Sequence, residues 1–533
     1  MSLTQDLPLP PIESVKVKIA KTKAQTRAFS IQAVLLSAAS VSAALHFLLT
    51  LRVPVIGDEA YYWLWSKHLA LGYHDHPPLI AWLIAASTLV SNSAFWVRFP
   101  ALLGWMASAA MFWLFASDVL QQKAKTVWAF LFFLSLPILA ISFVPVFPDN
   151  PLLFGWLVCM WGGYRALRDG RYWTLAGLGL GIAFLSKLIA VFLVLSFAFL
   201  FAASPDARKH LKTKDFWKGV AAAILVSLPL WIWNIGHGFE NFLFQARNHL
   251  GDHGLPPLAS FVQYAGVQVL AASPLLFALL ALTVVGLTKR SVAGDKTALF
   301  LLAFALPIHA VFGLLPFWST VGFHWAIPGY LALLVGCAYL ETGKRFWVGS
   351  LCFAAAMTIF FSMILSFPKQ VADLVFPLER SHPQWGIARF LEGKGYGEIL
   401  GYKELAKKAD HQYVAMNKTG NPLFLLTDSY TLSSDLAFYT GKTVRTILPN
   451  GQGGEYARWN HFEGLTGKNA LMISDRPLSQ IPEEVKAFNK AFSDIGESEP
   501  FSAKDGEVTR TFYSTILYDL QDPNALSALN RKQ

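Results

Sequence analysis

The sequence predicts a polytopic α-helical membrane protein that carries a soluble α/β domain at its C-terminal end. The 533-residue chain is 54% hydrophobic and only 15% charged, whereas soluble globular proteins usually carry about 25% charged residues. A single soluble core also stops growing near roughly 250–300 residues. Long apolar segments follow one another as far as Phe367, and beyond that residue the composition becomes mixed and charged.

A helix that crosses a bilayer needs about 20 mostly apolar residues. Eleven segments are candidates: 30–51, 97–118, 126–144, 151–166, 172–186, 188–203, 218–235, 262–287, 298–316, 325–341 and 346–367. The stretch 172–203 contains Lys187, so it allows either two short helices or one long tilted helix. The run 30–51 is too long for the core of a signal peptide, and we expect an uncleaved first span.

The formal net charge of +10 is distributed unevenly along the chain. With a cytoplasmic N-terminus, the cytoplasmic segments hold most of the lysines and arginines of the membrane part. The opposite side holds only Arg52, Lys67, Arg98, Lys187 and Arg247 before residue 368. Positive residues favour the cytoplasmic side of a membrane. The basic excess therefore indicates topology, and we expect no nucleic-acid partner.

Three regions follow from this topology. Residues 1–28 form a basic cytoplasmic tail, residues 29–368 form the transmembrane domain, and residues 369–533 form an external α/β domain. Within the last region, strand-like runs occur at 422–428, 469–475 and 509–520, and a helix-like stretch occurs at 430–439.

The first external loop contains the run "GDEAYYW" (57–63). Asp58, Tyr61, Tyr62 and Trp65 are spaced to share one face of a helix. Helices rich in tyrosine and tryptophan tend to lie at the membrane interface. We therefore expect Asp58 and Glu59 at the boundary between water and lipid, at the start of an interfacial helix. The alternative is that both acids only complement the helix dipole.

The same loop continues with "GYHDHPPL" (72–79). The two prolines disfavour helix before them, so His74, Asp75 and His76 are expected on a stiff turn. Histidine can bind phosphate when charged, carry a proton or ligate a metal. The spacing is a weak signal for a metal, so a divalent cation at His74, Asp75 and His76 stays an alternative, and no cofactor is expected to be required.

Further polar residues lie on the same predicted side. Asp149 stands between two prolines in "FPDNPLL" (147–153), as a helix cap or as an active-site acid. Lys187 is ionisable in apolar surroundings, which marks a functional candidate, although its amine could instead extend to the interface. The others are Asn234, His237, Gln245, Arg247, His249, Asp252, His253 and His324.

These motifs resemble the lipid-linked-sugar glycosyltransferases of the GT-C fold, in the dolichyl-phosphate-mannose–protein mannosyltransferase superfamily (glycosyltransferase families 39 and 83). The bacterial aminoarabinose transferase and the lipid A or core galacturonosyl transferases are closest in plan. The resemblance rests on "GDEAYYW", "GYHDHPPL", "FPDNPLL", "WN" (233–234), "FQARNHLG" (244–251) and "HWAIPGYL" (324–331). The runs "DSYTLSSDLAFYTGK" and "YARWN" (456–460) also look like the external domain of these proteins.

The resemblance implies roles for individual residues. The first-loop acid, proposed as a general base or as a group that positions the acceptor, is Asp58, with Glu59 beside it, and a second acid is Asp149. The aminoarabinose transferase has an acid–basic–proline triplet at the donor phosphate, which places His76 where that enzyme has lysine. Tyr61 stands where that enzyme has arginine, and this departure puts one phosphate contact in doubt. Lys187, Arg247 or His324 could supply that contact with the donor phosphate instead, and the sequence does not choose among them. Tyr61, Tyr62, Asp75 and Asn234 are the candidates for substrate binding.

The chemistry agrees with this resemblance. A polyprenyl-phosphate sugar carries its own leaving group, so the enzyme needs a base for the acceptor hydroxyl and cationic groups for the departing phosphate. We therefore expect an inverting glycosyltransferase of a bacterial inner membrane that acts on the periplasmic side. Its expected partners are an undecaprenyl-phosphate-linked sugar, a lipid A, core or other envelope glycan, and the bilayer.

Three other interpretations stay open at this point. A protein O-mannosyltransferase-like enzyme would share the fold and the donor type. A lipid or glycan transporter would show inverted repeats and acids near the centres of its spans, whereas the acids here lie at span edges. A non-catalytic envelope scaffold would use the C-terminal domain as its binding module.

The topology can be tested with a reporter that is active only in the periplasm. We expect activity from a fusion after Gln533 and none from a fusion near Lys212, because the basic segments stay in the cytoplasm. The reverse pattern would place Asp58 on the cytoplasmic side and contradict the prediction.

Overall fold

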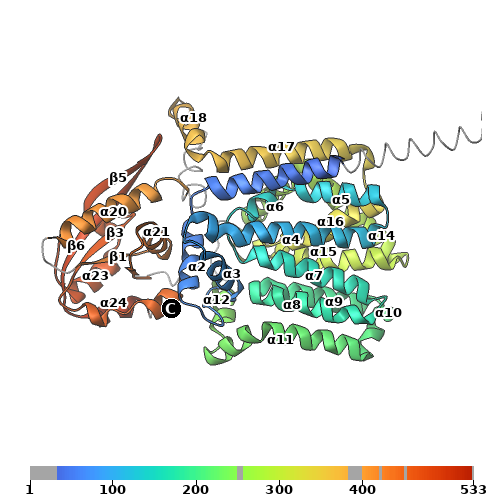
Figure 1. Ribbon diagram of the computed structural model, residues 1–533, viewed down its shortest axis with the longest axis horizontal. Helices are drawn as coiled ribbons and strands as arrows, with labels where there is room; N and C mark the ends of the chain where they lie inside the picture. The colour runs from blue at the N-terminus through green and yellow to red at the C-terminus, as the bar shows by residue number, and fades with distance from the viewer. Residues whose placement is uncertain (1–32, 249–255, 382–398, 419–422, 449–452, 531–533) are drawn as a thin grey trace, which may run out of the picture.

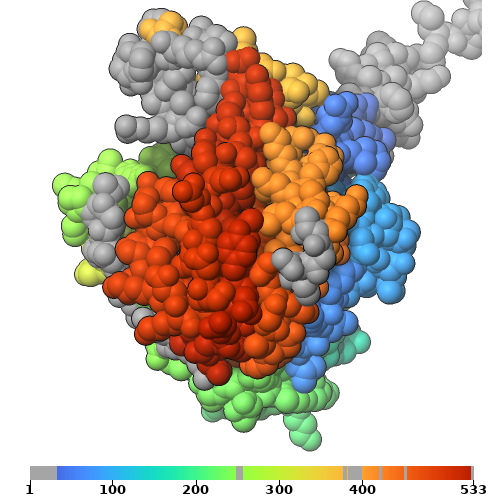
Figure 2. Space-filling model, turned by 90° about the vertical axis from the view of Figure 1, so that its left-hand side faces the viewer, coloured from blue at the N-terminus to red at the C-terminus, as the bar shows by residue number. Residues whose placement is uncertain are grey.

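A computed structural model describes residues 33–248, 256–381, 399–418, 423–448 and 453–530. Two parts are visible in Figure 1: a bundle of elongated helices, and a domain built on a β-sheet at one end of that bundle. We call the described residues 399–530 the sheet domain. Seen from its own end, the sheet domain lies over the bundle, whose helices show around its edges (Figure 2).

The helices of the first part run in chain order from Ala33–Arg52 to α18. They are α2 (Gly57–Lys67), α3 (Leu79–Thr88), α4 (Ala94–Leu120), α5 (Lys123–Ser135), α6 (Pro137–Ser142), α7 (Asp149–Ala166), α8 (Trp173–Ser186), α9 (Val191–Ala203), α10 (Pro205–Arg208), α11 (Lys214–Gly236), α12 (Glu240–Asn248), α13 (Pro257–Ala271), α14 (Pro274–Val292), α15 (Lys296–Leu314), α16 (Ile327–Leu340), α17 (Trp347–Ser366) and α18 (Pro368–Ser381).

Six helices in the described ranges are long and apolar enough to cross a membrane, or seven if one bent pair counts as a span. The six are Ala33–Arg52, Ala94–Leu120, Lys214–Gly236, Pro274–Val292, Lys296–Phe317 and Lys344–Ser366. The chain is therefore a multi-pass membrane protein. Other predicted spans coincide with shorter helices, such as Ile327–Leu340, and the total of eleven stays a prediction.

Two predicted spans are interrupted by breaks in the backbone, and a third break, at Lys187, agrees with the two-helix alternative predicted for 172–203. The segment 262–287 is not one helix, because α13 ends before Ser273, whose φ is +64°, and α14 starts at Pro274. The segment 126–144 breaks between α5 and α6, where Leu136 is extended before Pro137. The stretch 172–203 is two helices, because Lys187 has extended backbone angles between α8 and α9. Proline cannot continue the backbone hydrogen bonds of a helix, and hydropathy alone does not register such breaks.

Helices α7, α8 and α11 pack with their backbones unusually close together. A Cβ atom added to Gly177 of α8 would lie 1.9 Å from the carbonyl oxygen of Gly219 in α11. One added to Gly179 would lie 2.3 Å from the backbone nitrogen of Cys159 in α7. Small residues permit this close approach between membrane helices. We call these close contacts of Gly177 and Gly179 the glycine seam. It matters for the site because α7 begins at Asp149 and α8 ends next to Lys187.

Helices α2 and α3 lie across the end of the bundle, at the junction with the sheet domain (Figure 1). Tyr61, Tyr62 and Trp65 share one face of α2, as predicted, but they are buried in an aromatic cluster that includes Tyr456 of the sheet domain. The aromatic face of α2 therefore packs against protein, and the place of Asp58 and Glu59 at the boundary between water and lipid stays a prediction. The rings fill the space between the two parts of the protein.

The sheet domain has a six-stranded sheet in the order β2-β1-β3-β6-β4, with β5 paired to β6. Strands β1 to β3 are parallel, and β6 runs antiparallel to β3. The strands are β1 (Leu423–Thr427), β2 (Val444–Thr446), β3 (Asn469–Ser474), β4 (Phe492–Ile495), β5 (Glu499–Asp505) and β6 (Val508–Leu520), and the helices are α20 (Tyr402–Asn417), α21 (Tyr430–Thr440), α22 (Glu455–Trp459), α23 (Pro482–Ala491) and α24 (Pro523–Asn530).

The three predicted strands coincide with β1, β3 and β6, and the predicted helix at 430–439 coincides with α21. Strands β2, β4 and β5 were not predicted. Alternate residues of β1 enter two apolar clusters, with Phe424 and Leu426 in one and Leu423 and Leu425 in the other. Both faces of the sheet are therefore covered, as is usual for parallel strands.

The glycine seam predicts a matched pair of variants. Gly177→Ala should lower the melting temperature of the purified protein, because the new methyl group must push α8 and α11 apart, and overpacking usually costs about 1–3 kcal/mol. Gly236→Ala in α11 meets no atom within 4 Å and should be neutral or slightly stabilising. Equal melting temperatures for the two variants would contradict the prediction.

Candidate active site

A cavity of about 650 Å³ lies between the end of the bundle and the sheet domain. Its walls come from seven stretches of the chain: the start of α2, the turn at 75–76, the segment before α7, the break after α8 with the start of α9, helix α12, the end of α15 and the loop at 320–325. Tyr430 and Gly453 complete it from the sheet domain. The residues it brings together from the sequence prediction are Asp58, Tyr61, Tyr62, Asp75, His76, Asp149, Lys187, Gln245 and His324.

On one wall of the cavity, the Lys187 ammonium group forms an ion pair with the Asp149 carboxylate. The Lys187 amine donates hydrogen bonds to both carboxylate oxygens of Asp149, at 3.0 and 2.8 Å. Nε2 of His324 lies 3.3 Å from the same amine. A lysine ammonium can only donate, so Nε2 accepts. Burial and the Lys187 charge lower the pKa of His324 to about 4, which keeps the ring neutral beside the cation.

Local backbone structure explains how this pair forms. Asp149 lies in the first turn of α7, where a negative charge complements the helix dipole. Lys187 follows the last residue of α8 in an extended conformation, which turns its side chain out of the helix. Both side chains are only 9% exposed. The sequence predicted each residue as a candidate, but the ion pair between them could not be read from it.

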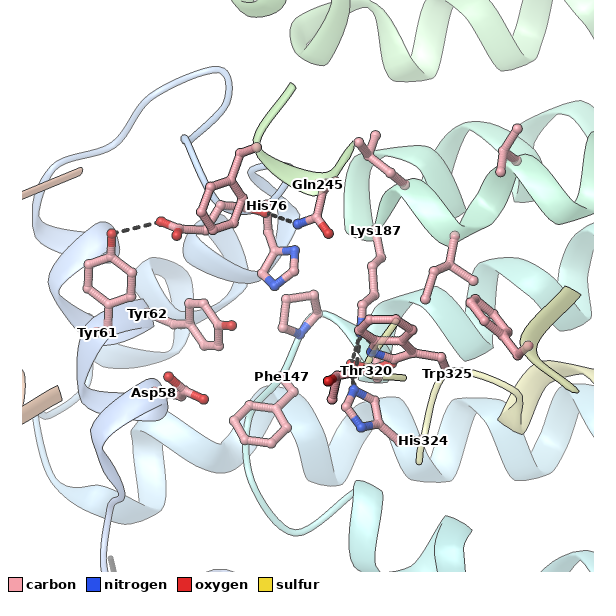
Figure 3. Close-up of a pocket in the computed structure, with 18 of the residues that line it drawn as sticks. Asp58, Tyr61, Tyr62, His76, Phe147, Lys187, Gln245, Thr320, His324 and Trp325 are labelled. Atoms are coloured by element: carbon pink, nitrogen blue, oxygen red, sulfur yellow. Dashed lines mark hydrogen bonds and ion pairs between the residues drawn. The ribbon is translucent and has the colours of Figure 1, made fainter. Parts of the chain in front are cut away.

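Asp58 lies on the opposite side of the cavity from Lys187 and His324, with Tyr62 and Phe147 between them (Figure 3). Its Oδ1 accepts a hydrogen bond of 2.9 Å from the hydroxyl of Tyr430, the first residue of α21. Burial and the Asp58 charge raise the pKa of Tyr430 well above its ordinary value. The phenol therefore keeps its proton and donates a hydrogen bond to the carboxylate.

Sequence reasoning missed Tyr430. The run "DSYTLSSD" was noted only for its resemblance to related external domains. No spacing rule connects it with Asp58, because 372 residues separate the two in the chain.

The turn containing His76 is held from several sides. Tyr61 donates a hydrogen bond of 2.8 Å to Oδ2 of Asp75, and Gln245 of α12 donates one of 2.7 Å to the backbone carbonyl of Asp75. The backbone N–H of Glu455 donates to the Tyr61 hydroxyl at 3.1 Å. Figure 3 shows the His76 ring between Tyr62 and Gln245. Asp75 and Tyr61 thus fix the turn, and His76 faces the cavity.

The structure corrects the predicted role of Glu59. Its side chain is fully buried and does not line the cavity. It forms an ion pair with Arg98, whose Nε donates to Oε1 at 2.7 Å. It also accepts the backbone N–H of Val146 at 2.9 Å. We therefore assign Glu59 a structural role: it ties the start of α2 to the segment before α7.

Two further predicted residues lie outside the cavity. Asn234 is buried in α11 and donates a hydrogen bond of 3.0 Å to the Leu230 carbonyl within its own helix. Arg247 is exposed on α12 and does not line the cavity. His249, Asp252 and His253 lie outside the described residues.

The weak metal alternative is not supported by the geometry. In the part of the chain that the structure describes, no group of three or more His, Cys, Asp or Glu side chains is placed to hold a metal ion. The His74 ring packs against Phe244, with 4.5 Å between ring centroids. Its Nδ1 lies 3.7 Å from Oδ1 of Asp75, while His76 faces the cavity, so the three side chains do not converge.

The Glu455 side chain makes a further contact between the sheet domain and the first loop. Oε1 of Glu455 accepts the His74 backbone N–H at 2.6 Å and a hydrogen bond of 2.8 Å from Arg458. Arg458 also pairs with Glu240 of α12. Burial raises the pKa of Glu455 to about 7, which outweighs the opposing effects of Arg458 and the His74 N–H. This carboxyl group therefore titrates near neutral pH.

Comparisons with known proteins agree with this geometry. A family model described as dolichyl-phosphate-mannose-protein mannosyltransferase matches residues 75–233. The lipid A galacturonosyltransferase RgtD of Rhizobium johnstonii is 30% identical over 324 residues, which cover 59% of this chain and 67% of the relative. The chain belongs to this superfamily of GT-C glycosyltransferases. The predicted family and enzyme class are confirmed, and the transporter and scaffold interpretations are set aside.

Other similar proteins support the same fold for this glycosyltransferase. The lipopolysaccharide core galacturonosyltransferase RgtB of the same organism is 26% identical over 320 residues, 54% of this chain and 62% of the relative. The crystal structure of ArnT from Cupriavidus metallidurans bound to undecaprenyl phosphate aligns with a TM-score of 0.60 at 13% identity, over 90% of this chain and 97% of ArnT. The apo structure of ArnT aligns with a TM-score of 0.61 at 13% identity, over 95% of this chain and all of ArnT.

The Glu455 contact predicts a pH dependence of stability. The unfolded chain loses the Glu455 proton near its ordinary pKa of 4.5, whereas the folded enzyme keeps it to about pH 7. The unfolded state thus binds fewer protons between these values, so the Glu455 contribution to the free energy of unfolding falls as pH rises from about 4.5 to 7, and then levels off. Glu455→Gln should lose less melting temperature than wild type between pH 5 and pH 8.

Glu463→Gln, at an exposed position of the same domain, is the control and should follow the wild-type profile. If Glu455→Gln loses as much melting temperature as wild type over this range, the pH dependence has another source.

Proposed function

We propose that this glycosyltransferase moves a monosaccharide from a polyprenyl-phosphate donor to a lipid A, core or other envelope glycan on the periplasmic face of a bacterial inner membrane. One observation carries the proposal. A single cavity presents the Asp58 carboxylate on one side and the Lys187 cation with His324 on the other (Figure 3). This arrangement separates a base from a phosphate-binding wall by the space that a sugar would occupy.

The Lys187 side suits the donor phosphate. Its cation faces the cavity close to His324, and His76 lines the same space. Preorganised cations and donors aimed at developing negative charge usually supply the largest part of catalysis. Asp149 holds the amine in place before substrate arrives. The neighbouring lining is apolar and suits the first isoprene units of the donor tail: Leu188, Ile189, Val191, Phe192, Phe312 and Leu315.

The Asp58 side suits the acceptor. In the proposed reaction, Asp58 takes the proton of the acceptor hydroxyl while that oxygen forms a bond to the anomeric carbon of the donor sugar. The bond from the anomeric carbon to the phosphate oxygen breaks, and its electron pair stays on the phosphate. Attack opposite to the leaving group inverts the anomeric centre. Tyr430 orients the Asp58 carboxylate through its hydrogen bond of 2.9 Å.

The comparisons support the choice of substrates. The two relatives are named lipid A and lipopolysaccharide core galacturonosyltransferases, and the ArnT structure holds undecaprenyl phosphate. Polyprenyl-phosphate galacturonic acid is therefore the first donor to test, with lipid A and a core-bearing lipopolysaccharide as acceptors. A protein acceptor has no specific observation in its favour.

The proposed topology fits the position of the cavity. We keep residues 1–28 as a cytoplasmic tail, 29–368 as the transmembrane domain and 369–533 as the periplasmic domain. The sheet domain lies at the same end of the bundle as the cavity and supplies Tyr430 and Gly453 to its lining. Base, donor wall and external domain would therefore share the periplasmic side.

The decisive variant is Asp58→Asn, assayed for sugar transfer in detergent. Asparagine keeps the shape and accepts the Tyr430 hydrogen bond, but it cannot take the acceptor proton. Loss of a general base usually costs about 10²–10⁴ in rate. We expect a protein that melts near the wild-type temperature, still binds the donor and transfers almost no sugar.

Glu59→Gln is the matched control, one residue away. It should lower the melting temperature, because it breaks the buried pair with Arg98, yet retain far more transfer activity than Asp58→Asn below its melting temperature. If Asp58→Asn transfers sugar at nearly the wild-type rate, Asp58 is not the base. If the wild-type enzyme uses no polyprenyl-phosphate sugar at all, the proposed donor class is wrong.

A further inference from the structure

A second cavity, of about 400 Å³, lies between the C-terminal end of α2 and the sheet domain. Its lining includes Trp63, His68, Lys442, Arg445, Tyr456 and Trp459. None of the polar residues that line the first cavity takes part in it. Its size lies within the range of about 300–1,000 Å³ that is typical of small-ligand sites.

Aromatic rings form one part of the wall of this second cavity. The His68 ring stacks on Trp459, with centroids 4.7 Å apart and an interplanar angle of 21°. The Tyr456 and Trp459 rings meet edge to face at 5.7 Å. Rings fixed by such contacts present large, rigid surfaces with little conformational entropy left to lose. Flat rings of this kind suit the apolar C–H face of a sugar.

One lining cation, Arg445, forms no ion pair with a carboxylate in the described ranges, and only the charge of Glu463, an exposed residue, opposes the effect of burial on it. Lys442 is paired with Asp410. Arg445 donates one hydrogen bond, of 3.0 Å, to the backbone carbonyl of Trp459, which uses one of the five N–H donors of a guanidinium. Burial lowers the pKa of Arg445, as expected for a positive charge that is only partly compensated. An anion in the cavity would provide that compensation.

The second cavity adjoins the active site. Tyr456, which lines it, stacks on Tyr61 with centroids 5.7 Å apart and an interplanar angle of 6°. Tyr61 lines the first cavity. Two stacked rings therefore separate the spaces, and different sugars of one branched or extended glycan could lie on the two sides of this wall.

We propose that the second cavity is a subsite for an anionic sugar of the acceptor glycan, with Arg445 binding its carboxylate or phosphate and the aromatic rings packing on its ring. The inference rests on the proposed function, because it assumes a glycan acceptor. The subsite would bind a part of the acceptor on the other side of the stacked Tyr61 and Tyr456 rings from the reacting hydroxyl. A planar guanidinium is well suited to carboxylate and phosphate oxygens.

The test is direct binding to the full-length enzyme in detergent, measured by isothermal titration calorimetry without any donor. Trigalacturonate provides a carboxylate sugar, glucose 6-phosphate a phosphate sugar, and maltotriose a neutral match. Wild type should bind at least one anionic ligand more tightly than maltotriose. Arg445→Gln should weaken that binding at least about tenfold, because it removes a charge-assisted hydrogen bond. The ligand that responds identifies the anionic group.

Arg510→Gln is the control: this guanidinium belongs to the same domain but lies over the Tyr402 ring and does not line the cavity. It should bind both anions as wild type does, and all variants should share one melting temperature within a few degrees. Equal binding by Arg445→Gln and wild type, or no preference of wild type for either anion over maltotriose, would overturn the proposal.

The outcome is separable from the proposed function. Asp58→Asn should bind the anionic sugar normally while it fails to transfer. In transfer assays, Arg445→Gln should raise KM for the acceptor lipid and leave KM for the polyprenyl-phosphate donor unchanged. If wild type transfers no sugar but binds trigalacturonate through Arg445, the proposed function fails and the anionic-sugar site stands.

Discussion

The site depends on a lysine buried at the point where two helices are interrupted. Burying a charge is costly unless it is paired and hydrogen-bonded, and Lys187 meets this condition through both oxygens of Asp149. The two side chains meet where α8 ends before Lys187 and α7 begins at Asp149. The glycine contacts among α7, α8 and α11 keep these ends in register. The packing of the bundle helices therefore fixes the position of the Lys187 cation at the cavity wall.

The sheet domain supplies part of the site and does not stand apart from it. Tyr430 bonds to Asp58, Glu455 bonds to the turn before His76, and Tyr456 stacks on Tyr61. The first external loop is therefore enclosed between the two parts of the protein. An isolated bundle would expose the aromatic face of α2 and leave Asp58 without the Tyr430 hydrogen bond.

Much of this could be predicted from the sequence, and the failures have physical reasons. Asp58, Asp149 and Lys187 stand out because charged groups are rare beside apolar segments. Glu59 was misassigned because neighbours on a helix point about 100° apart, and only the fold shows that its direction leads to Arg98. Tyr430 was missed because its partner is distant in the chain. The break at Ser273 and Pro274 was missed because hydropathy averages over single residues.

The buried Glu59 carboxylate has a consequence for how the enzyme could change. It accepts the N–H of Val146, three residues before Asp149, and it follows directly after Asp58. In the proposed mechanism, this buried side chain therefore helps to hold the base and the donor-binding wall at a fixed distance. To accept a longer or shorter sugar, the enzyme would need a change at Glu59 or its partners. Substitutions of residues that line the cavity would leave the distance between Asp58 and the Lys187 wall unchanged.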